Sequence, residues 1–341
     1  MNDNNKNIKM SYPFPKSTSA RERVAKLLEV VDPGDTLGVL IDADPDAMAS
    51  AIALGRLLWR KAAHVLIYRI NPIKRADNLA FIDLLKVKQL HISQLKKSKI
   101  TRWAIVDSQP HHNEEFMGFD FDIIIDHHPV QDGFNARFID IRENYGATST
   151  IMTEYLRAAR IKPSTKLATA LFCGIKTDTA NFTRECLHND IDAFRYLHSF
   201  ANMNIIKKIE SSEMTKKTLD KLHFAIEQLT LVKKVAYVHM GKVDNPDVLV
   251  IVADFFIKMA EALWSVVSGV WGDKVIIIMR TASFRKNAGK VIQKLFGHWG
   301  GSAGGHLSAA RAEIPLSNIL KEISDQSELP NFIKKHLTGL G

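Results

Sequence analysis

The chain has 341 residues, of which 46% are hydrophobic, and its formal net charge is +9. This length exceeds one ordinary domain core, so we expect a globular protein of two domains. Two cysteines, Cys173 and Cys186, are too few for a disulfide framework. Charged residues interrupt the most apolar stretch, 248–279, too often for a membrane span. With no apolar leader segment at the N-terminus, we predict a cytoplasmic protein without a membrane partner.

The positive charge suits an anionic ligand, although a solvated lysine-rich surface gives the same sign. Basic clusters lie at 86–102, 207–208, 216–217 and 233–234. They contain no interleaved aromatic residues, so they predict no stacking platform for single-stranded nucleic acid.

The N-terminal half alternates strands and helices. Residues 1–19 are polar and contain prolines, and we expect them to be disordered. After a helix that ends near Val31 and a turn at 32–35, strands are expected at 36–41, 63–70, 87–92, 103–106, 119–124 and 138–139. Helices are expected at 46–60, 75–85, 147–160, 164–175 and 189–200. This alternation predicts an α/β fold with a parallel sheet.

The pattern changes in the C-terminal part. Residues 207–230 are polar with apolar residues at helical spacing, as in a connecting helix. Strands are expected at 235–240 and 275–279, with a helix from 246 or 250 to about 267 between them, and a glycine-rich segment follows at 297–310. The predicted organisation is a disordered segment 1–19, a parallel-sheet domain 20–204, a linker helix 205–234 and a smaller α/β domain 235–341.

Ionisable side chains follow four of the apolar runs in the first domain. Residues 39–41 precede Asp42, Asp44 and Asp46; 103–106 precede Asp107; 119–124 precede Asp126, His127 and His128; and 171–175 precede Asp178. The carboxyl ends of parallel strands form the edge where ligands bind. One such pattern is ordinary, but four in sequence predict a metal site.

Carboxylate and imidazole ligands without thiolates suit Mn²⁺ and Mg²⁺ best, with Zn²⁺ as a third choice. The acids outnumber the ligands that one ion needs, so two ions are expected. Two ions about 3.5–4 Å apart can clamp the attacking and leaving oxygens of an in-line displacement at phosphorus, with a bridging hydroxide as the nucleophile. The sequence contains neither a Gly-x-Ser-x-Gly nor a Walker motif, which favours hydrolysis by activated water.

These residues resemble the motifs of the DHH phosphoesterase family. Asp42-Ala43-Asp44-Pro45-Asp46, Asp107, Asp126-His127-His128 and Thr177-Asp178-Thr179 match motifs one to four in order and spacing. The terminal segment 300–310 resembles the Gly-Gly-Gly-His segment of the domain that accompanies the DHH domain. The resemblance covers roughly residues 20 to 315, and the size and two-domain plan resemble the branch of oligoribonucleases and 3′-phosphoadenosine phosphate phosphatases.

The resemblance implies two Mn²⁺ ions in a cleft between the two domains. One ion would be held by Asp42, Asp44 and Asp107, and the other by Asp46, Asp107, His127 and Asp178. Asp126 would orient an imidazole, and His128 would reach the scissile phosphate or the leaving oxygen. The substrate's far end would be held by Arg280, Gly304, Gly305 and His306, since glycines admit a phosphate to the backbone and arginine binds phosphate bidentately.

The sequence departs from the family pattern at three places. Asp42 stands where members acting on short oligonucleotides usually have His, which is nearer to RecJ-type exonucleases; Arg184 is displaced by one position; and Ser302 and Ala303 interrupt the glycine segment.

The predicted function is a Mn²⁺-dependent phosphodiesterase that cuts short oligonucleotides or dinucleotides to mononucleotides. An alternative within the same chemistry is a phosphatase of 3′-phosphoadenosine phosphate, pyrophosphate or polyphosphate. A nucleotide-binding sensor without catalysis is disfavoured, because every predicted metal-ligand position carries a competent side chain. The expected partner is the nucleotide substrate, and a homodimer is possible.

Overall fold

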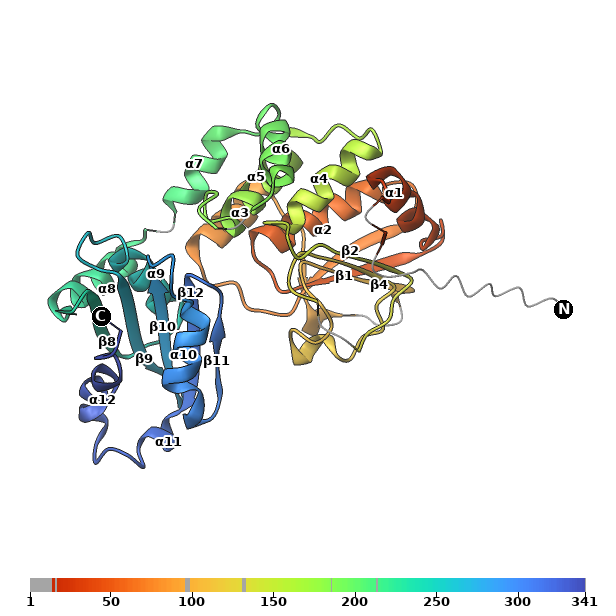
Figure 1. The fold of residues 1–341 in the computed structure, drawn as a ribbon. Coiled ribbons are helices and arrows are strands. Elements are labelled where there is room, and N and C mark those ends of the chain that lie inside the picture. The colour runs from red at the N-terminus through yellow and green to blue at the C-terminus, as the bar shows by residue number, and fades with distance from the viewer. Residues whose placement is uncertain are drawn as a thin grey trace. The chain divides into compact units, whose positions relative to one another are not determined.

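The structure, a computed structural model (Figure 1), describes residues 14–15, 17–95, 99–130, 133–184, 186–212 and 214–340. Most of the segment predicted to be disordered, 1–19, lies outside the described residues. The chain divides into two compact units, Met1–Glu213 and Met214–Gly341. The predicted domain limits and the predicted cleft between the domains stay predictions.

Within the described residues of the first unit, six parallel strands form one sheet in the order β3-β2-β1-β4-β5-β6. Their bounds are β1 Thr36–Ile41, β2 His64–Arg69, β3 Leu90–His91, β4 Arg102–Val106, β5 Ile123–Asp126 and β6 Phe138–Ile141. Leu40 pairs with Ile105, and Ile105 pairs with Ile124. With this register, the residues that follow β1 and β4 come out beside the last residue of β5.

Both faces of this sheet are covered, which explains the apolar strands. Val39 and Val106 face a core shared with the helices, whereas Leu40 and Ile105 face a second core built with Phe116 and other aromatic side chains. The helices are α1 Ala20–Glu29, α2 Pro45–Leu57, α3 Ala76–Leu85, α4 Thr148–Ala158, α5 Thr165–Asp178, α6 His188–His198 and α7 Met203–Ser211.

The second unit contains a mixed sheet. Within its described residues, six strands follow the order β11-β12-β10-β9-β8-β7, with β8 and β9 parallel and the other pairs antiparallel. The strands are β7 Thr230–Val232, β8 Val235–Lys242, β9 Trp264–Trp271, β10 Lys274–Thr281, β11 Ser302–Gly305 and β12 Ala309–Pro315. The helices are α8 Lys216–Glu227, α9 Asp247–Phe256, α10 Ala288–Phe296, α11 Leu316–Ile319 and α12 Leu329–His336. Side chains of α8 and α9 share a core with one face of the sheet, and those of α10 and α12 with the other.

The helix predicted from 246 or 250 is present as α9, but its predicted end near residue 267 is wrong. Helix α9 ends at Phe256, and β9 follows as a central strand between β8 and β10. The strand is buried along almost its whole length. A strand buried on both faces shows no alternation of polar and apolar residues, so periodicity does not separate it from a buried helix.

The stretch expected to form one connecting helix contains more than one element. Helix α7 ends at Ser211, α8 begins at Lys216 after Thr215, and β7 starts at Thr230. Thr215 has an extended backbone, and its side chain accepts a hydrogen bond from the Thr218 backbone nitrogen. This is N-cap geometry, so a new helix starts here.

The α/β fold class, with a parallel N-terminal sheet followed by a second, smaller α/β unit, is confirmed. Among the described residues, none of the helices has the length and apolar character that crossing a membrane requires.

Candidate metal centre

The sheet topology brings three predicted motifs to one edge of the first unit. Asp107 follows β4, and Asp126, His127 and His128 lie at the end of the neighbouring strand β5. Asp46 lies in the first turn of α2, and Asp178 is the last residue of α5, which packs closely against α2.

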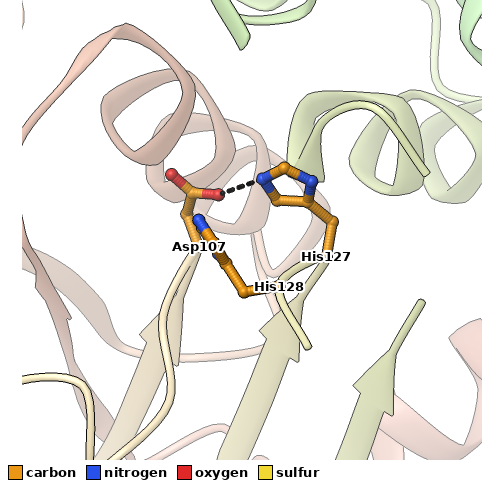
Figure 2. A group of neighbouring side chains, drawn as sticks. All are labelled: Asp107, His127 and His128. Carbon is orange, nitrogen blue, oxygen red and sulfur yellow. Dashed lines mark ion pairs between the residues drawn. The ribbon is translucent and has the colours of Figure 1, made fainter. Parts of the chain in front are cut away.

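Four of these side chains lie within ligand distance of one ion. Single ligand atoms of Asp46, Asp107, His127 and Asp178 are all within 4.8 Å of one another. The Nε2 atom of His127 is 3.1 Å from Asp178 Oδ2 and 3.5 Å from Asp107 Oδ1. Figure 2 shows Asp107, His127 and His128 converging from the ends of adjacent strands.

Asp107 has an unusual backbone for a residue with a side chain. Its φ of 61° lies in the left-handed region, which asparagine and aspartate tolerate better than most residues. The Asp107 nitrogen donates to the carbonyl of Ile125 over 2.9 Å. Its Oδ1 accepts a hydrogen bond of 2.8 Å from the Thr148 hydroxyl. Such strain persists where the surroundings fix it, and it concentrates at functional sites.

Asp46 is held by the N-terminus of helix α4. Its two carboxylate oxygens accept hydrogen bonds from the backbone nitrogens of Thr148 at 2.7 Å and Ser149 at 2.8 Å. These nitrogens are among the first donors of a helix, which have no partner within the helix. Asp46 therefore both stabilises α4 and is oriented by it.

The imidazole of His127 is oriented by a backbone carbonyl. Its Nδ1 lies 3.0 Å from the oxygen of Tyr145, so Nδ1 carries a hydrogen and Nε2 faces the carboxylates. Among the described residues, buried Nε2 has no partner in hydrogen-bonding geometry despite its short distance to Asp178. A lone pair facing carboxylate oxygens is favourable only with a proton or a cation between them.

The raised pKa values of these side chains also favour a bound cation. Burial alone would lower the pKa of His127, but the nearby carboxylate of Asp178 and the charge of Asp46 raise it to about 10. Burial, with the charge of Asp178 second, raises the pKa of Asp46 to about 6. Burial and neighbouring carboxylates also raise the pKa of Asp107 well above its usual range. Buried carboxylates in excess of cationic groups fit a bound divalent ion.

His128 belongs to a second network. Its Nδ1 is 2.8 Å from Asp126 Oδ1, and the other oxygen of Asp126 accepts a 2.7 Å hydrogen bond from the Gln109 amide. Burial would raise the pKa of Asp126, but the hydrogen bond and charge of His128 outweigh it and lower the value. Asp126 thus orients His128 and not His127.

Asp42 and Asp44 lie outside the group of four. Asp42 is exposed. Asp44 is half-buried, and its side chain caps α2 by accepting a 2.9 Å hydrogen bond from the Ala47 nitrogen. Burial and the charge of Asp178 nevertheless raise the pKa of Asp44 well above its usual range. The predicted role of both residues at another ion stays a prediction.

The predicted substrate residues lie in the second unit. Arg280 is at the end of β10, where its Nε donates to Asp254 Oδ1 over 2.6 Å. Gly304 and Gly305 are in β11, and His306 follows them with an exposed side chain. A Cβ built at Gly304 would meet nothing within 4 Å. Their predicted substrate-binding role stays a prediction.

Sequence reasoning missed the residues that hold the ligands in place. Thr148, the carbonyl of Tyr145 and Gln109 carry no motif of their own. The sequence predicts Gly174 only as a helix residue. In the structure, a Cβ at this position would lie 2.9 Å from Asp46 Oδ1. For Gln109 the sequence contains one signal, its position two residues after the predicted ligand Asp107.

Two family models match the chain. The model described as DHH family, N-terminal domain, matches residues 37–175, and the DHHA1 domain matches residues 232–334. The uncharacterized protein MJ1633 of Methanocaldococcus jannaschii is 36% identical over 296 residues, which cover 86% of this chain and 60% of that protein. The chain therefore spans less than two thirds of the length of this relative.

Solved structures with the same fold include the following two. An exopolyphosphatase-related protein from Bacteroides fragilis has a TM-score of 0.69 at 15% identity, over 95% of this chain and 100% of that one. RecJ from Thermus thermophilus, in complex with Mn²⁺, has a TM-score of 0.54 at 15% identity, over 93% of this chain and 54% of that one.

Proposed function

Because the chain belongs to the DHH family, as its DHH and DHHA1 domains show, we propose that it is a metal-dependent phosphoesterase acting on short oligonucleotides or dinucleotides. The observation that carries the proposal is the buried group of Asp46, Asp107, His127 and Asp178, whose ligand atoms lie within 4.8 Å of one another. The predicted family resemblance is confirmed, whereas its branch is part of the proposal.

The metal in the proposal is Mn²⁺, as two ions, with Mg²⁺ as a substitute. Oxygen donors with one imidazole and no thiolate suit these ions. Asp46, Asp107, His127 and Asp178 would hold one ion, and Asp42 and Asp44 would complete the other with Asp107. When bound, such ions supply Lewis acidity to phosphoryl oxygens and activate water for attack.

The protein's own part is positioning and proton transfer. Thr148 and the start of α4 fix Asp107 and Asp46, and the Tyr145 carbonyl fixes the tautomer of His127. Asp126 accepts the Nδ1 hydrogen of His128. The Nε2 atom of His128 is therefore the one that would face the substrate. In its protonated form, His128 would give the Nε2 proton to the leaving oxygen. Hydrogen-bond donors that are already in position at such a centre lower the activation barrier, because they do not have to reorient during the reaction.

The substrate assignment rests on the second unit. Arg280 and the exposed glycines Gly304 and Gly305 would hold the remote phosphate, with His306 beside them. Remote binding energy of this kind can orient the reacting phosphate. Phosphatase activity on 3′-phosphoadenosine phosphate, pyrophosphate or polyphosphate is the competing outcome.

The test is product analysis of the full chain with Mn²⁺ on the dinucleotide pApA, on 3′-phosphoadenosine phosphate and on pyrophosphate. We expect mononucleotide from pApA and no reaction in EDTA. Release of inorganic phosphate from the other two, with pApA intact, would select the competing substrates. Equal rates in EDTA would refute a metal centre.

Asp107→Ala should be the most damaging single substitution, since it removes the ligand proposed to be shared by both ions. The exposed Asp120, changed to Ala, serves as the control carboxylate. If Asp107→Ala kept more than about a tenth of the wild-type rate, a loss under ~1.4 kcal/mol, the shared-ligand role would be wrong.

A further inference from the structure

Phe284 in the second unit is an aromatic side chain that lies outside the hydrophobic cores of that unit. It is 98% exposed, and it lies in the loop between β10 and α10. Folding favours burying a phenylalanine by roughly 1.5–3 kcal/mol. An aromatic ring held fully in solvent is therefore available for a ligand.

The loop that carries Phe284 is fixed by hydrogen bonds on both sides of the ring. The Ser283 nitrogen donates to Thr281 Oγ1 over 3.0 Å, and the Arg285 nitrogen donates to Ser283 Oγ over 3.2 Å. Asn287 then caps α10 by accepting from the Lys290 nitrogen over 2.9 Å. The ring thus stands on a defined turn, which lowers the entropy lost when a ligand binds.

The first residues of α10, which follow this loop, are joined to the glycine segment. The Ala288 nitrogen donates to the Leu307 carbonyl over 2.8 Å, and the Gly289 nitrogen donates to the His306 carbonyl over 3.0 Å. A Cβ at Gly289 would lie 2.3 Å from the carbonyl oxygen of Gly305, so only glycine allows this approach. Close packing therefore sets the position of the start of α10, into which the loop leads, relative to the exposed backbone of Gly305.

The chain segment that carries the ring is positively charged. Arg285 and Lys286 follow Phe284 directly and are exposed, and residues 284–300 contain four Lys or Arg and no Asp or Glu. Within the described residues, neither Arg285 nor Lys286 forms an ion pair. An exposed aromatic ring with cations next to it in the chain is a combination that binds a nucleobase and its phosphate.

We propose that Phe284 stacks on a nucleobase of the substrate while Arg285 and Lys286 neutralise the adjoining phosphate. The inference rests on the proposed function and narrows it to substrates with a base, because pyrophosphate and polyphosphate offer no ring to stack on. The basic clusters named from the sequence do not include this loop, although Arg285 and Lys286 are adjacent cations as in three of those clusters.

The test compares pApA with analogues that lack one or both adenines. Binding to the full chain in EDTA is measured by calorimetry, so it does not depend on catalysis. Phe284→Ala and Phe284→Leu should weaken pApA binding about 5- to 150-fold, the loss typical of one stacked base, whereas Phe284→Trp should keep it. Since the side chain is exposed, all three variants should fold. Trp59→Ala, which removes a 66% exposed aromatic from the first unit, is the control.

Comparing wild type with Phe284→Ala on both pApA and the analogue tests whether Phe284 stacks on a base. If Phe284 stacks on a base, the analogue without that base should bind wild type and Phe284→Ala almost equally. Equal binding of pApA by wild type and Phe284→Ala, an equal loss on the analogue without adenines, or no binding of pApA to wild type would overturn the inference. Base-dependent binding without Mn²⁺-dependent hydrolysis would refute the proposed function alone.

Discussion

Gly174 allows α5 to approach Asp46, a candidate metal ligand, and an alanine side chain at this position would collide with Asp46 and Ser149. A Cβ at this position would lie 2.4 Å from Ser149 Oγ, 2.9 Å from Asp46 Oδ1 and 3.0 Å from Asp46 Cα. Ordinary contacts between such atoms are about 3.5–4.0 Å. The hydroxyl can rotate away, but the backbone of Asp46 must shift by several tenths of an ångström.

The magnitude follows from two opposing effects. Overpacking of this kind costs about 1–3 kcal/mol, whereas alanine favours a helix over glycine by about 1 kcal/mol. Gly174→Ala should therefore lower the free energy of unfolding by about 0–2 kcal/mol. Gly55→Ala in α2 is the matched control, because its Cβ would meet Val65 Cγ1 at an ordinary 3.6 Å. The control should gain up to about 1 kcal/mol.

The assays are thermal unfolding of the full chain by circular dichroism and Mn²⁺ titration by calorimetry. For a unit of this size, each kcal/mol shifts Tm by about 2–4 °C. Displacing a ligand or its support commonly weakens metal binding by about 10- to 100-fold. We expect that loss for Gly174→Ala and wild-type affinity for Gly55→Ala. Adding Ser149→Ala to Gly174→Ala removes the shortest contact and should restore only part of the loss.

One result would refute this reasoning. If Gly174→Ala melted like Gly55→Ala and bound Mn²⁺ as tightly as wild type, the approach of α5 to Asp46 would be irrelevant to the site.

Three further predictions concern hydrogen bonds and protons. Thr148→Val should weaken Mn²⁺ binding by about 10- to 100-fold relative to Thr148→Ser, which keeps the hydroxyl that donates to Asp107; equal titrations would contradict this role. Because the pKa of His127 is raised to about 10 and its Nε2 must lose a proton to bind metal, Mn²⁺ affinity should keep rising with pH between about 7 and 9. An unperturbed histidine would level off above ~6.5, so a flat affinity in that range would point to an ordinary imidazole. Burial lowers the pKa of His239 to about 4, so the unfolded chain binds more protons there and stability should fall by up to about 3 kcal/mol as pH drops from ~6.5 to ~4. Urea unfolding of wild type and His239→Gln checks this, and the same slope in both would exclude His239.

The sequence determined the parallel sheet of the first unit and the residues at its edge. Strand β1 matches its predicted limits, because a short apolar run between a turn and an acidic cluster has few alternatives. Asp107 and His127 were predicted as ligands from their positions after such runs, and the structure brings them together with Asp46 and Asp178.

Only the tertiary structure decided which acids meet and what holds them. Thr148 lies 41 positions from Asp107, and Ser149 lies 103 from Asp46, so their hydrogen bonds exist only after α4 has packed against the sheet. The same holds for β9, whose apolar run suits a helix or a buried strand until neighbouring strands supply backbone partners. Local sequence limits which conformations a segment can adopt, and long-range hydrogen bonding and packing select among them.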